Sequence, residues 1–130
     1  MNKGITMNKE AIIKGKKALI GWVCMLTNMS DSFWFQPFRE GGWGTADVIS
    51  HFISWEKFVI ENRIKPLIKE EALPKIKVDV QAMNDAASLY ARSGISKEDL
   101  IEECISMREE LVSLLEKISV DVRVSKMICP

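Results

Sequence analysis

The chain has 130 residues, of which 47% are hydrophobic and 28% are charged, so it is long enough to bury a real core and short enough to be one domain. Its 18 basic residues balance its 18 acidic residues, which disfavours binding to the phosphates of nucleic acid or to an anionic membrane surface. The longest nearly apolar stretch, residues 18–29, is shorter than the roughly 20 residues that a membrane span needs. We expect one domain, residues 1–130, with neither nucleic acid nor membrane as a partner.

The first predicted element is a helix over residues 7–29. Apolar side chains recur there at steps of three, four and seven, namely Ile12, Leu19, Ile20, Val23 and Leu26. The next stretch, residues 30–44, contains Pro37 and three glycines, which predicts a loop. Because this loop is rich in Phe and Trp, we expect its aromatic side chains, Phe33, Trp34, Phe35, Phe38 and Trp43, to close one end of the fold.

A second helix is predicted from Thr45, which suits an N-cap, to about Lys65 or Pro66, because the residue before a proline is pushed out of the helical region. Apolar side chains cover a wide arc of this helix, so we expect the helix to lie at the centre of the fold. It includes Val48, Ile49, Phe52, Ile53, Trp55, Val59 and Ile60. The charged segment that follows, with two prolines, predicts a connector.

Two more helices complete the prediction. Residues 80–93 form the third, with Met83, Ala87 and Tyr90 inside and Gly94 as its stop. "SKED" at 96–99 is a capping box that opens the fourth. The fourth helix carries the longest apolar stripe, namely Leu100, Ile101, Cys104, Met107, Leu111, Leu114, Leu115 and Ile118. After Ser119 the alternation "VDVRVSKM" predicts an extended tail. The fold class is therefore all-α, a four-helix bundle with a short extended tail.

The three cysteines are odd in number and widely spaced, which argues against a disulfide framework and favours a reducing, cytoplasmic location. Cys24 and Cys104 stand among apolar neighbours at helical spacing, so we expect both to be small core residues. Cys129, near the C-terminus, is expected to be exposed.

His51 is the only histidine, and it shares a predicted helix face with Val48 and Trp55. Asp47, one turn earlier, could approach the same ion. Two ligands are too few for a catalytic zinc site, which uses about three from the protein. If no further ligands are close, we expect His51 to be a partly buried histidine that is hydrogen-bonded to a carboxylate or carbonyl.

The segment "GGWGTADVISHFISWEKF", together with the helices on either side, resembles the DinB-like superfamily of four-helix-bundle proteins, which includes the DinB, YfiT and DfsB types. The resemblance covers residues 7–119. Trp43, His51, Trp55 and Glu56 carry it. In metal-binding members, a histidine at the position of His51 joins a histidine pair on a later helix to hold a divalent cation. This sequence has no second histidine, so the resemblance implies an incomplete metal triad.

Three functions follow as hypotheses. The first is a protein that binds or detoxifies a small molecule without the usual three-histidine site, in a pocket lined by Trp43, His51, Trp55 and Tyr90, with His51 as the catalytic residue, a general base or a hydrogen-bond donor. The second is a metal-dependent hydrolase or transferase with a reduced Zn or Ni site of His51 plus Asp47 or Glu56. The third is a non-enzymatic bundle that has lost a helix and covers the exposed face with a second copy, as a homodimer. The first ranks highest; whether the protein is an enzyme stays open.

Overall fold

A computed structural model describes residues 9–117, and over this range the protein is all-α, as predicted. In chain order its elements are α1 (Lys9–Met25), the 3-10 turn η1 (Leu26–Asn28), α2 (Asp31–Phe35), α3 (Thr45–Val59), the π-helical turn η2 (Ile60–Ile64), α4 (Lys65–Ile68), α5 (Val80–Ala91) and α6 (Lys97–Glu116). The four predicted helices correspond to α1, α3, α5 and α6. No helix within the described range is both long and apolar enough to cross a membrane.

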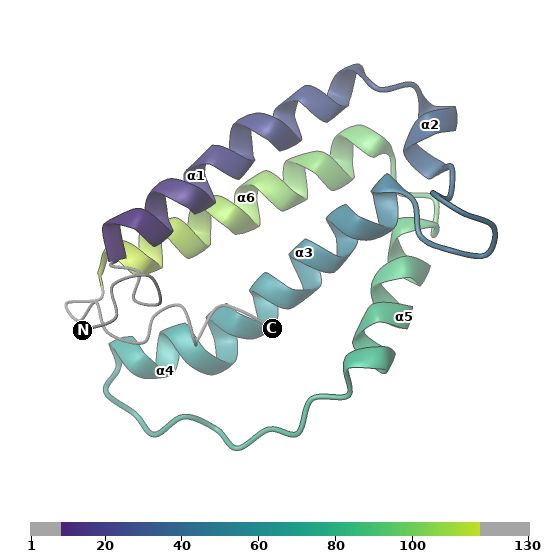
Figure 1. Cartoon of the computed structure of the whole chain (residues 1–130). Coiled ribbons are helices and arrows are strands. Elements are labelled where there is room, and N and C mark those ends of the chain that lie inside the picture. The colour runs from purple at the N-terminus through teal and green to yellow at the C-terminus, as the bar shows by residue number, and fades with distance from the viewer. Residues whose placement is uncertain (1–8, 118–130) are drawn as a thin grey trace, which may run out of the picture.

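The long helices lie side by side in the order α1, α6, α3, α5 (Figure 1). Helix α6 packs against both α1 and α3, and α3 packs in turn against α5. The predicted central position of the second helix is therefore confirmed for α3. Helices α1 and α5 form the two edges of this arrangement, so each has a side turned away from its main neighbour.

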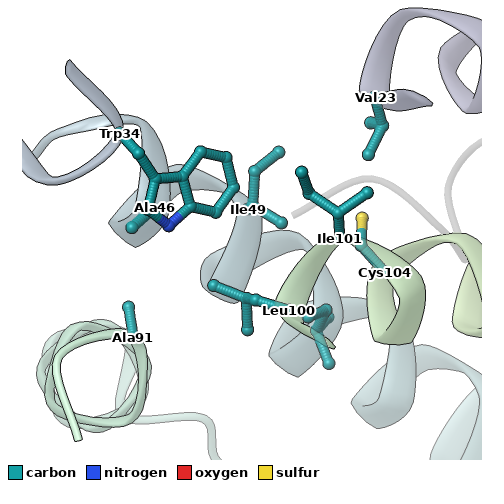
Figure 2. Close-up of a cluster of buried hydrophobic side chains, with 9 residues drawn as sticks. Val23, Trp34, Ala46, Ile49, Ala91, Leu100, Ile101 and Cys104 are labelled. Atoms are coloured by element: carbon teal, nitrogen blue, oxygen red, sulfur yellow. The ribbon is translucent and has the colours of Figure 1, made fainter. Parts of the chain in front are cut away.

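Two hydrophobic clusters fill the space between the helices. One lies where α3 passes into η2 and α4; its buried residues are Ile12, Trp55, Val59, Ile60, Ile64, Leu111 and Leu115. The other joins the opposite ends of α1, α3 and α6 to α2 (Figure 2); its buried residues are Val23, Trp34, Ala46, Ile49, Ile53, Ala91, Leu100, Ile101 and Cys104. The apolar stripe predicted for the fourth helix supplies both clusters, although Met107 and Leu114 are only half-buried.

The segment predicted as a loop contains a short helix, α2, which Ser30 caps by accepting a hydrogen bond from the Phe33 amide at 3.3 Å. Only Trp34 of its aromatic residues is fully buried, whereas Phe33 and Phe38 are 63% and 70% exposed. The expectation that all these aromatics close the end of the fold was therefore wrong. A helix turns successive side chains by about 100°, so one turn of α2 can direct only part of them into the core.

Helix α3 begins at Thr45, but its N-cap is Gly44, so the prediction of Thr45 as the N-cap was wrong. A Cβ atom on Gly44 would lie 2.4 Å from the carbonyl oxygen of Gln36. This close approach requires glycine at a position where serine or threonine is normally favoured.

The predicted end of the second helix at Lys65 or Pro66 was also wrong, because helical structure continues through η2 and α4 to Ile68. Pro66 stands at the start of α4, where a missing amide hydrogen is tolerated. The wider π turn before it relieves the clash between a proline ring and the carbonyl four residues earlier.

Helices α5 and α6 both begin at side-chain caps. Asp79 accepts from the Ala82 amide at 3.0 Å, and Ser96 accepts from the Asp99 amide at 3.1 Å. Helix α5 ends at Ala91, two residues before the predicted end at Ser93, with Arg92 as its C-cap, and Gly94 follows with a φ of 104°.

On α5, Ala87 is buried and Met83 half-buried, but Tyr90 is 41% exposed, so its predicted place on the inner face was wrong. Ala91 is buried in its place. The predicted extended tail, Ile118 and Cys129 lie outside the described residues.

Two glycines of the chain should respond in opposite ways to replacement by alanine. Gly44→Ala should lower the free energy of unfolding by roughly 1–3 kcal/mol, because the new methyl group meets the Gln36 backbone. Gly21→Ala, in the middle of α1 with open space around the new Cβ, should raise it by about 0.5–1 kcal/mol. Urea unfolding of both variants measures the difference, and an equal response at the two positions would contradict the close approach at Gly44.

Candidate functional site

His51 lies in the second turn of α3 and is half-buried. Its ring centroid is 5.5 Å from that of Trp43, with the two planes tilted by 48°, and 6.1 Å from that of Phe52. Trp43 is held in the preceding loop, where its carbonyl accepts a hydrogen bond from the Phe38 amide at 2.7 Å. The structure therefore brings together two of the residues predicted to share a pocket, Trp43 and His51.

Trp55 and Tyr90 lie in different surroundings. Trp55 is buried in the core, stacked on Phe58 at 5.3 Å between centroids, with the Arg63 guanidinium 5.3 Å from its ring. Tyr90 donates a hydrogen bond from its hydroxyl to Glu103 at 2.7 Å, on the surface between α5 and α6. That bond, with partial burial and the charge of Glu103, raises the pKa of Tyr90.

Asp47 is fully buried and joins three parts of the chain. Its Oδ1 accepts from the Ser88 hydroxyl at 2.6 Å and from Arg92 Nε at 3.1 Å. Its Oδ2 accepts from the Gly44 amide at 2.7 Å and from Arg92 Nη2 at 2.5 Å. Burial by itself would raise the pKa of Asp47, but the hydrogen bonds from Arg92, Gly44 and Ser88 outweigh it and hold the pKa below its ordinary value.

Glu56 forms an ion pair with Arg108 of α6, and both side chains are buried. Burial raises the pKa of Glu56, although the charges of Arg108 and Lys16 act in the opposite direction. Within the described range, Glu56 Oε1 and Arg108 Nε have no hydrogen-bond partner. The Arg108 guanidinium also lies 6.0 Å from the Phe52 ring.

These contacts bear on the predicted metal site of His51 with Asp47 or Glu56. Both oxygens of Asp47 already accept hydrogen bonds, and Glu56 is paired with Arg108. In the part of the chain that the structure describes, no three His, Cys, Asp or Glu side chains are grouped as a metal site would need. Asp47 and Glu56 are thus each paired with an arginine in this arrangement, and the metal site of His51 stays a prediction.

The two described cysteines differ in environment. Cys104 is buried, as expected, and burial together with the charge of Glu56 raises the pKa of its thiol to about 12. Cys24 is exposed, so its predicted place in the core was wrong. It follows Val23 on α1, and the turn of about 100° between neighbours takes it off the face that buries Val23.

A groove of about 840 Å³ opens between the end of α1, α2 and the start of α3. Its walls are mostly apolar, and none of its lining residues carries a charge. They are Met25, Leu26, Asn28, Met29, Ser30, Phe33, Gln36, Pro37, Phe38 and Thr45. Sequence reasoning missed this groove because it assigned the same aromatic residues to the core. The signal available was the density of Met and Phe in residues 25–38, where Pro37 disfavours a continuous helix.

The contacts of Asp47 predict how acid affects stability. Because the folded pKa of Asp47 lies below the unfolded one, its contribution is present at neutral pH and is lost as the pH falls below about 4. Asp47→Asn should lower the free energy of unfolding by about 2–4 kcal/mol at neutral pH and flatten its fall in acid. Urea unfolding across the pH range, with exposed Asp85→Asn as the control, measures both effects; equal losses in the two variants would contradict the network.

Thiol reactivity should separate the two cysteines. In a Cys129→Ser background, Cys24 should react with a disulfide reagent in the native protein, whereas Cys104 should react at least about a hundredfold more slowly because its thiol stays protonated and buried. Denaturant should make the two rates equal. Mass spectrometry of the labelled peptides measures the rates, and fast native labelling of Cys104 would contradict its placement in the core.

No protein-family model matches this chain, and no curated protein or solved structure matches it either. The resemblance carried by Trp43, His51, Trp55 and Glu56 therefore depends on those residues of the sequence. What the protein does is argued from the geometry of the groove and of the Trp43–His51 pair.

Proposed function

We propose that this chain is a DinB-like helical bundle that binds a small, uncharged and largely apolar molecule in the groove between α1, α2 and α3. The groove itself supports the proposal, because about 840 Å³ lies within the range of volumes that hold small ligands and cofactors. Phe33 and Phe38 stand on its rim with most of their surface in water. A bound apolar molecule would cover that surface and gain the free energy of removing it from solvent.

The groove's chemistry limits the class of ligand. Its flexible Met25 and Met29 side chains can adapt to ligands of different outline. Its polar groups are amides and hydroxyls, from Asn28, Gln36 and Thr45 among others, which can form hydrogen bonds without favouring either charge. A neutral molecule with an apolar body and one or two hydrogen-bonding groups meets these conditions.

His51 has a role in this proposal that does not need a metal. Trp43 connects it to the groove, because the Trp43 carbonyl is bonded to Phe38 on the groove wall and the Trp43 ring contacts His51. A ligand that extends from Phe38 along Trp43 would approach the imidazole. His51, which is half-buried, would then donate or accept one hydrogen bond.

Binding of the neutral fluorescent probe N-phenyl-1-naphthylamine tests the groove. We expect saturable binding, with energy transfer from the tryptophans to the probe. Phe33→Ser and Phe38→Ser should each weaken it by about tenfold, which corresponds to about 1.4 kcal/mol. Leu89→Ser is the matched control, because Leu89 is an apolar side chain that is 75% exposed on α5 and does not line the groove. Binding that does not saturate, or that falls equally in Leu89→Ser, would overturn the proposal.

A further inference from the structure

Helix α1 has a second apolar side besides the one that packs into the core. The core side is marked by Ile12 and Val23, which are buried. On another side lie Gly15, Ala18, Trp22 and Met25, spaced by three and four residues, and all four are exposed. Residues at this spacing form one continuous line along a helix. We call these four residues the outer stripe.

Leaving the outer stripe exposed to water costs the folded chain free energy. Trp22 is 47% exposed and Met25 is 70% exposed. Gly15 stands in the middle of a helix, where glycine is less stable than alanine by roughly 0.5–1 kcal/mol. Nothing that the structure describes comes within 4 Å of the place where its Cβ would be. The packing of the described chain therefore gives no reason for a glycine there, whereas the close approach of another helix would.

The charges of α1 favour one orientation for such a helix. Lys14, Lys16 and Lys17 lie in its first half, and residues 18–30 carry no charge. Two copies of α1 side by side and parallel would bring their lysines together. In the antiparallel orientation, the lysines of one copy lie beside the uncharged half of the other and near the negative end of its helix dipole. The charge pattern of α1 is therefore complementary to itself only when the two copies run in opposite directions.

A two-fold axis at Ala18 gives the register. The two Ala18 residues then face each other, because each position meets the one equally far on the other side of residue 18. Met25 lies over the small, exposed Ala11 of the second copy, which together with the facing Ala18 residues allows the helices to approach closely. Trp22 lies over Lys14 of the second copy, whose ammonium group would meet the indole ring in a cation–π arrangement.

We propose that the outer stripe of α1 is the interface of a homodimer in which the two α1 helices pair in antiparallel orientation about Ala18. Helix α1 lies at the edge of the helical layer (Figure 1), and the residues of the outer stripe are exposed in the described chain. The paired segment from Ala11 to Met25 is about 21 Å long. A helix pair of this length buries less than the roughly 800 Å² per partner of a standard interface, so the dimer should be reversible and weak.

Disulfide cross-linking tests the register. Ala18→Cys, in a chain that also carries Cys24→Ser and Cys129→Ser, should form a covalent dimer rapidly on mild oxidation, because antiparallel helices bring the two positions within disulfide distance. The matched control retains the exposed Cys24 and carries only Cys129→Ser; it should not cross-link, since Cys24 lies on another side of α1. Cross-linking through Cys24 without cross-linking in the Ala18→Cys chain would overturn the proposal.

Sedimentation velocity over a range of concentrations tests the dimer without cross-linking. Ala18→Glu should weaken self-association by at least about tenfold, because it brings two like charges together at the two-fold axis. Leu89→Glu, at an exposed position of α5 away from the stripe, should leave it nearly unchanged. A wild-type protein that is monomeric at every concentration, or an equal effect of the two substitutions, would overturn the proposal. The test does not depend on ligand binding, because Ala18 and Leu89 do not line the groove.

Discussion

The buried carboxylate of Asp47 is the interaction on which the region around the candidate site depends. It binds Arg92 and Ser88 of the α5 region and the Gly44 amide at the start of α3, and Arg92 in turn donates a hydrogen bond to the Phe35 carbonyl at 3.2 Å. Three segments, at Phe35, residues 44–47 and residues 88–92, are thereby held in one arrangement. Since the segment between Phe35 and Gly44 carries both Phe38 and Trp43, the groove wall and the ring contact of His51 depend on this network.

Several buried charged side chains lie where helices meet, and each forms a different kind of contact. Lys97, at the start of α6, is buried and donates hydrogen bonds to the carbonyls of Thr27 and Met29 at the end of the 3-10 turn η1. Glu56 and Arg108 connect α3 to α6 across the core. A buried ion pair adds little stability compared with a well-packed apolar pair, but losing one partner is costly. These contacts therefore disfavour other ways of packing the same helices.

The surfaces that support both proposals belong to the edges of the helical layer. The order α1, α6, α3, α5 leaves α1 with α6 as its main neighbour, so one side of it remains exposed. The groove lies at the end of this helix and the outer stripe along its length, with Met25 part of both. A small ligand in the groove and a second copy on the stripe would each cover apolar surface that the described chain leaves in water.

The sequence by itself determined the class of fold, the four long helices and much of the core, because apolar spacing and caps such as Ser96 act over a few neighbouring residues. It also placed Trp43 and His51 in one region. Only the tertiary structure decided which carboxylate meets which arginine, since Asp47 and Arg92 approach from separate helices. It also decided which apolar positions stay exposed: α1 has two apolar sides, and periodicity shows neither which one packs on α6 nor that Cys24 and Phe33 face water. An α-helix has the same repeat of 3.6 residues around its whole circumference, so the elements that pack against it decide which of its sides is buried.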